Sequence, residues 1–272
     1  MMPVIHEIIC KSLLNKSGIP GFDYTVNPYT GCLHACAYCY ARFMSRHTAH
    51  GMPWGSFCDV KANALEILDR ELRRRPMGLT SLSTVTDPYQ GPEQKYGLSR
   101  EILIRLAGAG FPVSILTKSD LVLRDLDVLK RFPAENLQVG FSLNTSDDAV
   151  SRAFEPGAPP VSRRIRALKR LHAEGIATWV FLAPLLPALS EKSLPALLDE
   201  VSGSADRVLA DGLNIKCGNW RGISAVIQAS YPSLMEEYRA VCFSETGKSG
   251  YYDRLFGRIR ALCAERRIPA DF

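Results

Sequence analysis

The chain has 272 residues, of which 46% are hydrophobic and 22% are charged, and its net charge is +5 at neutral pH. This composition is ordinary for a globular protein with a sizeable core, and the charge is too small for a dedicated nucleic-acid coat. No apolar run is long enough to cross a bilayer and the N-terminus lacks a signal-peptide pattern, so we expect a cytoplasmic monomer with no membrane partner.

Strand-like and helix-like segments alternate along the chain. We expect strands over residues 24–27, 79–85, 112–116, 138–143, 177–183 and 207–211. We expect helices over residues 59–75, 99–109, 120–131, 161–174 and 194–201, and a helical tail over 233–243 and 251–267. Asp59 and Ser99 are candidate helix N-caps, and Gly175 is a candidate helix stop.

Six strand–helix units in succession predict an α/β fold with a parallel sheet and right-handed crossovers. An open doubly wound sheet and part of a β/α barrel both fit this alternation. No glycine-rich phosphate fingerprint follows the first strand, which weakens the dinucleotide-binding version. We expect a single domain over residues 1–272, with a core at about 24–216 and a C-terminal helical extension at about 217–272.

The loop after the first predicted strand, residues 31–40 (GCLHACAYCY), is the most informative segment. Its cysteines, Cys32, Cys36 and Cys39, have the spacing C-x3-C-x2-C. Three thiolates from one short loop can hold three irons of a [4Fe–4S] cluster and leave the fourth iron open. The alternative is a zinc site completed by His34, His47 or His50. Iron–sulfur is favoured, because structural zinc sites usually draw two ligand pairs from two knuckles.

Polar residues follow the other predicted strands at the same end: Thr84, Thr86, Asp87, Thr117, Lys118, Ser142, Asn144, Lys216, Cys217 and Asn219. In parallel β/α folds this end of the sheet is where sites are built. We therefore expect these loops to surround one site. Cys217 is a candidate hydrogen-atom donor because it lies at this rim, whereas Cys10, Cys242 and Cys263 are expected to be packing residues.

Two segments are rich in basic residues. Residues 70–75 contain four arginines, and residues 163–170 contain five basic side chains. Both fit the solvated outer face of a helix, and both also fit a surface that tracks phosphates.

The chain resembles the radical S-adenosylmethionine (SAM) enzymes, and within them the spore photoproduct lyase-like (DNA repair photolyase-type) branch. The resemblance spans about residues 27–187 and rests on five segments: 27–32 (NPYTGC), 39–42 (CYAR), 86–90 (TDPYQ), 155–159 (EPGAP) and 183–187 (APLLP). It implies the family fold, a partial (β/α)6 barrel, here with C-terminal helices.

The resemblance also implies the cofactors, a [4Fe–4S] cluster on the three clustered cysteines and SAM on the residues that follow strands two to four. By position these SAM-binding residues are Thr86, Lys118 and Ser142. A lysine suits the SAM carboxylate as a charge partner. Arg164 matches an arginine common in the branch, although it lies within a basic helix face.

One position departs from the branch. The spore lyase returns a hydrogen atom from a cysteine near the end of strand two, and the matching residue here is Thr84. Its O–H bond is too strong for that role, so repair of the spore thymine lesion is not expected. Tyr40 matches a tyrosine that assists the step and is a second candidate catalytic residue beside Cys217.

The resemblance therefore implies reductive cleavage of SAM, with an electron from an external donor, to give a 5′-deoxyadenosyl radical that abstracts hydrogen from a substrate. A nucleic acid is one substrate class, by analogy with the lyase and from the basic helices. A small molecule or a peptide is the second. A function of another class is a zinc-holding nucleic-acid-binding module without catalysis.

Overall fold

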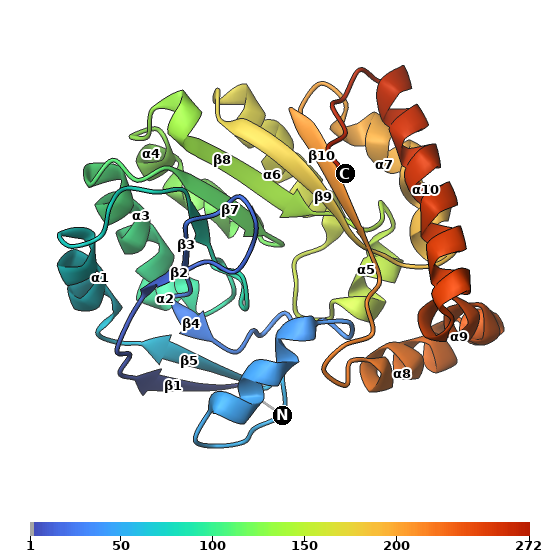
Figure 1. Cartoon of the computed structure of the whole chain (residues 1–272), viewed down its shortest axis with the longest axis horizontal. Coiled ribbons are helices and arrows are strands. Elements are labelled where there is room, and N and C mark those ends of the chain that lie inside the picture. The colour runs from blue at the N-terminus through green and yellow to red at the C-terminus, as the bar shows by residue number, and fades with distance from the viewer. Residues whose placement is uncertain (1–2) are drawn as a thin grey trace.

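The structure is a computed structural model that describes residues 3–272. Its centre is a seven-stranded sheet in the order β10-β9-β8-β7-β6-β3-β2 (Figure 1). The strands are β2 (Leu14–Lys16), β3 (Tyr24–Val26), β6 (Thr80–Leu82), β7 (Val113–Thr117), β8 (Leu137–Ser142), β9 (Ala177–Leu185) and β10 (Arg207–Gly212). Neighbouring strands from β3 to β10 run parallel, and β2 joins β3 in antiparallel register.

The six predicted strands are therefore confirmed, and the order β3-β6-β7-β8-β9-β10 follows the chain, as expected for β/α units with crossovers of one hand. Strands β10 and β2 are the two edges and do not pair with each other. The sheet is thus a barrel that stays open, which confirms the predicted partial β/α barrel and excludes the doubly wound sheet, whose strand order reverses.

Helices cover the outer face of the sheet and continue into a helical tail beside β10 (Figure 1). The helices between the strands are α1 (Ala64–Leu72), α2 (Glu93–Tyr96), α3 (Leu98–Gly108), α4 (Leu126–Leu129), α5 (Asp148–Phe154), α6 (Val161–Ala173) and α7 (Leu189–Val201). The tail consists of α8 (Trp220–Ser230), α9 (Met235–Phe243) and α10 (Glu245–Glu265). Short 3-10 turns are η1 (Tyr40–His47), η2 (Asp120–Asp125), η3 (Ala134–Asn136) and η4 (Pro232–Leu234). Within residues 3–272, no helix is both long and apolar enough to cross a membrane.

A second, three-stranded sheet, in the order β1-β5-β4, was not predicted. Its strands are β1 (Val4–Ile8), β4 (Tyr29–Thr30) and β5 (Phe57–Lys61). The predicted helix over 59–75 is therefore too long, and Asp59 is not its cap. Asp59 lies inside β5, directly opposite His6 of β1, and helix α1 begins after Asn63. The physical reason is tertiary: four successive residues of β5 are buried between two strand partners.

Two further expectations are wrong in detail. Ser99 is not an N-cap: helix α3 begins one residue earlier, after Gly97 in left-handed conformation, and the Ser99 backbone N–H donates to Glu93 at 2.9 Å. The segment 120–131 is not one helix but the 3-10 turn η2 followed by α4. Gly175 ends α6 at a φ of +80°, as predicted.

Candidate active site at the cysteine loop

The cysteine loop, residues 31–40, leaves β4 through a turn that requires glycine. Gly31 has a φ of +85°, and a Cβ on it would lie 2.6 Å from the ring and from the carbonyl oxygen of Phe57. Any other side chain would therefore collide with β5 as well as strain the backbone. The loop is thus seated directly on the second sheet.

The loop after β6 fastens the start of the cysteine loop. The Thr86 hydroxyl donates to the Gly31 carbonyl at 2.6 Å, and the Gln90 amide donates to the same oxygen at 3.1 Å. In return, the Leu33 backbone N–H donates to Gln90 Oε1 at 2.8 Å. The segment TDPYQ therefore has a structural role, because its side chains hold the start of the cysteine loop by hydrogen bonds. The proton of the Thr86 hydroxyl takes part in one of these bonds.

The second half of the loop is held by α5, which follows β8, and by the segment that follows β10. The Ala37 N–H donates to the Phe154 carbonyl at 2.8 Å, and the buried Asn219 amide donates to the Tyr38 carbonyl at 2.8 Å. Gly157 approaches so closely that a Cβ there would lie 2.0 Å from the Leu33 carbonyl oxygen. Three strand-end loops converge on ten residues, as the rim pattern in the sequence predicted.

The three thiols of this loop are free and largely screened from solvent. Cys32 and Cys36 are 8% and 6% exposed, and Cys39 is half-buried. Burial raises the pKa of the Cys36 thiol to about 12 and that of Cys32 well above its ordinary value. Buried thiols without a compensating charge are held protonated, so a metal centre would have to displace their protons.

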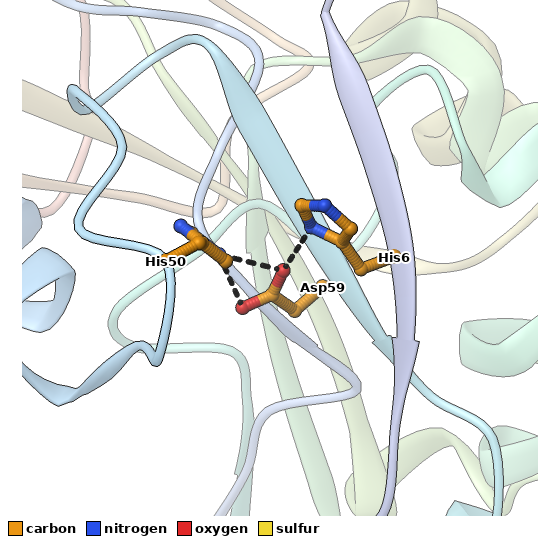
Figure 2. A group of neighbouring side chains, drawn as sticks. All are labelled: His6, His50 and Asp59. Atoms are coloured by element: carbon orange, nitrogen blue, oxygen red, sulfur yellow. Dashed lines mark hydrogen bonds and ion pairs between the residues drawn. The ribbon is translucent and has the colours of Figure 1, made fainter.

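The described residues include one compact set of possible metal ligands outside the cysteine loop. Within residues 3–272, one group of three possible ligands has all its donor atoms within 4.8 Å of one another, and it is His6, His50 and Asp59 (Figure 2). The three cysteines are the other candidate ligands and all stand on one loop, an arrangement that suits three irons of a [4Fe–4S] cluster.

The histidines considered as a fourth zinc ligand have other surroundings. The His50 Nε2 atom lies 3.1 Å from Asp59 (Figure 2), and the buried His34 lies 3.4 Å from an oxygen of Asp87. Burial lowers the pKa of His34, so its ring is held neutral. His47 is exposed at the end of η1. None of them forms a compact ligand group with the three cysteines within residues 3–272.

A buried ion pair lies beneath the loop, and sequence reasoning did not foresee it. Arg164 is fully buried and pairs with Glu155, which is 1% exposed. Arg164 also donates to the carbonyls of Pro159 at 2.9 Å and Ser142 at 3.2 Å. The Tyr38 hydroxyl donates to the same Glu155 carboxylate. Burial acts to raise the pKa of Glu155, but Arg164 and Lys118 hold it below its usual range.

Arg164 therefore does not lie on the solvated face of α6, although it belongs to the basic run at residues 163–170. The period of the helix turns this one arginine inward while Arg163, Arg166 and Arg170 stay exposed. The nearest signal in the sequence is the segment EPGAP, whose Glu155 is the partner. The sequence alone could not pair two residues on different elements.

Lys118 and Ser142 keep polar atoms available at the rim. The Lys118 ammonium lies 5.8 Å from the centre of the Tyr38 ring and makes no hydrogen bond or ion pair within residues 3–272. Burial acts to lower its pKa, yet the Cys36 thiol and the Glu155 carboxylate raise the pKa above the ordinary value. Ser142 is buried at the end of β8, and its hydroxyl has no hydrogen-bond partner in the same residues. These groups can receive an anionic, hydroxyl-bearing ligand.

The structure joins Tyr40 to Thr84 and leaves the Cys217 side chain exposed. The Tyr40 hydroxyl donates to the Thr84 carbonyl, and the ring stays 49% exposed. The Thr84 hydroxyl bonds to that of Thr25 at 3.1 Å. Cys217 is exposed in a left-handed turn with a φ of +55°, two residues before the Asn219 clamp. Within residues 3–272, the hydrogen bonds of Tyr40 and Thr84 do not include Cys217.

A cavity of about 570 Å³ opens on the His34 side of the loop. Its walls include His34, Tyr89, Ser119, Arg124, Gly157 and Arg163.

Comparison with known proteins agrees with this geometry. The model of the radical SAM superfamily matches residues 26–201. The chain is 33% identical over 256 residues to an uncharacterized protein of Methanocaldococcus jannaschii, covering 94% of this chain and 93% of that protein. A radical SAM Nalpha-GlyT isomerase of Pseudomonas phage M6 is 27% identical over 164 residues, which are 60% of this chain and 33% of the phage protein.

Among solved structures, a spore photoproduct lyase double mutant with bound AdoMet and dinucleoside spore photoproduct superposes with a TM-score of 0.71. The two chains are 15% identical, and the match covers 98% of this chain and 80% of the lyase. At this identity the likeness shows a shared fold.

Proposed function

The chain belongs to the radical SAM superfamily and is a radical SAM enzyme, and from that premise we propose that Cys32, Cys36 and Cys39 hold a [4Fe–4S] cluster with one iron open to SAM. The observation that carries the proposal is the set of three free thiols on one loop at the spacing C-x3-C-x2-C, two of them buried and the third half-buried. When bound, the cluster would take an electron from an external donor and cleave SAM to methionine and a 5′-deoxyadenosyl radical for hydrogen abstraction.

In this proposal, Lys118 and Ser142 bind SAM. The unpaired Lys118 ammonium is the charge partner for the SAM carboxylate, and the free Ser142 hydroxyl bonds a polar group of the nucleoside. Thr86 can bind SAM only as a hydrogen-bond acceptor, because its hydroxyl already donates to the Gly31 carbonyl.

The ion pair of Arg164 and Glu155 orients the loop for this task. Glu155 fixes the Tyr38 hydroxyl, and Tyr38 stands between two of the cluster cysteines. The Tyr38 side chain is itself buried. A dry and rigid cradle prevents a radical from reacting with solvent.

We also propose that Cys217 returns a hydrogen atom to the product radical, with Tyr40 assisting. Cys217 is exposed at the rim, and Thr84 cannot replace the cysteine of the spore lyase. Its S–H bond would break and the carbon radical would become C–H. The thiyl radical left behind would return to the thiol by taking one electron from the external donor and one proton from water. In D2O the exchanged thiol should deliver deuterium to the product; equal uptake by wild type and Cys217→Ala would contradict this role.

The proposed substrate is a nucleic acid. The support is the overall positive charge and the exposed cations of α6, together with a fold shared with a lyase solved with a dinucleoside lesion. The second candidate is a small molecule or a peptide, which the cavity near His34 would admit. Mobility shift of duplex DNA or transfer RNA at low salt separates the two, and absence of any shift there would favour the second.

The cofactor proposal is tested by anaerobic reconstitution with iron and sulfide. We expect a brown protein that forms 5′-deoxyadenosine from SAM with dithionite, and complete loss of both properties in Cys36→Ala. Cys242→Ala is the matched control, because Cys242 is a half-buried cysteine on α9 outside the loop. Stoichiometric zinc with no uptake of iron would instead support the noncatalytic zinc module. We expect the enzyme to act in the cytoplasm, where thiols stay reduced.

A further inference from the structure

One short segment, residues 86–90, contacts both the cysteine loop and the residue proposed to bind the SAM carboxylate. Its first and last residues hold the start of the cysteine loop, and between them Asp87 bonds to the end of β7. We propose that Asp87 is a positioning residue for SAM, which fixes the backbone of Lys118 so that the Lys118 ammonium meets the SAM carboxylate. This inference rests on the proposed function and adds to it a residue that acts only through Lys118.

The Asp87 carboxylate is buried, and both of its oxygens accept hydrogen bonds. The residue is 7% exposed. One oxygen accepts the Thr117 hydroxyl at 2.7 Å and the Tyr89 backbone N–H at 2.9 Å. The other oxygen accepts the Lys118 backbone N–H at 2.8 Å. A buried carboxylate is stable only with such donors, so these bonds fix the end of β7 against residues 86–90.

The Lys118 side chain has no anchor of its own. Its ammonium makes no hydrogen bond or ion pair within residues 3–272 and lies 5.8 Å from the centre of the Tyr38 ring. The backbone on both sides of this lysine is held instead. Asp87 accepts the Lys118 N–H, and the Thr117 hydroxyl, which donates to Asp87, accepts the Ser119 N–H at 3.0 Å. The place from which the Lys118 side chain extends therefore depends on Asp87.

The segment that carries Asp87 is itself anchored. Pro88 follows Asp87, and the buried Ser99 hydroxyl of α3 donates to the Pro88 carbonyl. On the side of the cysteine loop, Nδ1 of the buried His34 lies 3.4 Å from the same Asp87 oxygen that accepts the Lys118 N–H. The cysteine loop and Lys118 are thus attached to one support.

A fixed lysine matters because SAM would be held at two points. In the proposed function these points are the cysteine loop, which follows β4, and Lys118, which follows β7. A ligand held at two points binds most tightly when the separation of the points is set before it arrives, because binding then costs less ordering of the protein. Asp87 lies between the two loops and sets that separation.

The test is anaerobic equilibrium dialysis of SAM against the reconstituted protein, with the iron content measured on the same samples. Asp87→Ala removes all three hydrogen bonds and should weaken SAM binding about 10-fold, with the iron content of wild type. Asp87→Ala in the Lys118→Met background should bind SAM as Lys118→Met alone does, because the two residues act through one contact. A merely structural role would make the two losses multiply.

Asp148→Ala is the matched control. Asp148 also accepts one backbone N–H and one hydroxyl, both from Ser162, at 3.0 and 2.7 Å. It lies at the start of α5 and makes no hydrogen bond to Lys118 or to the cysteine loop within residues 3–272. The control should bind SAM as wild type does.

The outcomes separate this inference from the proposed function. A reconstituted wild-type protein that binds no SAM overturns the proposed function and the premise of this inference with it. Equal SAM affinity in Asp87→Ala and wild type overturns the inference alone, and so do losses that multiply in the double variant. If Asp87→Ala does not fold or takes up no iron, Thr117→Val decides, because it keeps the side-chain volume and removes the hydroxyl that links Asp87 to Ser119. That variant should bind SAM about 5-fold more weakly, and an unchanged affinity would overturn the inference.

Discussion

Arg163 and Arg164 are neighbours in sequence on α6, yet they occupy opposite environments. Arg164 is fully buried and joins Glu155 beneath the cysteine loop. Arg163 is 53% exposed and pairs with Asp120 at 2.7 Å on the outer face of the helix. The inner face of α6 therefore builds the site, and the outer face meets the solvent.

The difference shows that one basic run can serve two purposes. On the inner face a single cation is desolvated, and its charge must be matched by a carboxylate. On the outer face Arg163 and Arg170 have carboxylate partners, whereas Arg166 and Lys169 are exposed and have no ion pair within residues 3–272. Those two are the cations available to a phosphate.

The largest expected effect comes from breaking the inner pair. Glu155→Gln leaves the buried Arg164 without a counter-charge, which should lower the free energy of unfolding by about 3–5 kcal/mol. Urea denaturation of the apoprotein measures it. A loss below about 1 kcal/mol would mean that the pair is no stronger than a surface one.

Acid should remove the same contribution. The pKa of Glu155 is lower in the folded protein than its usual value, so its ionised form stabilises the fold at all pH values above the unfolded pKa of about 4.3. The contribution is lost as the pH falls through the lowered folded pKa. The difference in stability between wild type and Glu155→Gln should therefore be full at pH 7 and shrink below about pH 4.

The second largest effect is expected at Lys118. Its ammonium lies near Tyr38 and lowers the pKa of Glu155, but it makes no hydrogen bond or ion pair within residues 3–272. Lys118→Met should weaken SAM binding about 10- to 100-fold, the loss expected for one charge-assisted contact of about 1.5–3 kcal/mol. Anaerobic equilibrium dialysis of the reconstituted protein measures it. Lys169→Met is the control from the outer face and should bind SAM as wild type does; equal binding by both variants would remove Lys118 from the SAM site.

The third effect tests the outer face as a phosphate-binding surface. Replacing Arg166 and Lys169 by alanine should lower the slope of log K against log salt for duplex DNA by about one for each contact removed. Fluorescence anisotropy over a range of salt concentrations measures the slope. If the slope stays the same, these cations do not contact nucleic acid.

The smallest effect is expected for the outer ion pair. Asp120→Asn removes the partner of Arg163 at a site where water can replace it, so stability should fall by less than about 1 kcal/mol. The same urea experiment measures it. If Asp120→Asn lowered the free energy of unfolding as much as Glu155→Gln, the two faces of α6 would not differ in the way described.

The sequence alone was sufficient for the parallel α/β fold, the cysteine motif and the rim pattern. Those features are local: strands and helices follow from the period of apolar residues, and C-x3-C-x2-C places three ligands on one loop whatever surrounds it. Polar residues directly after parallel strands must meet at one edge, so Lys118 and Ser142 could be placed there in advance. Their roles toward SAM remain predictions.

Only the tertiary structure decided the environment of each polar group. Asp59 is read locally as a helix cap, but pairing with β1 and β4 places it in a strand between two histidines. Arg164 matches an arginine of the branch but stands in a basic run of the sequence, and only the structure shows that it turns inward to Glu155, directly after α5. Burial, and the partners that it makes necessary, depend on contacts between distant segments, because a desolvated charge or donor is stable only where the fold supplies its counterpart.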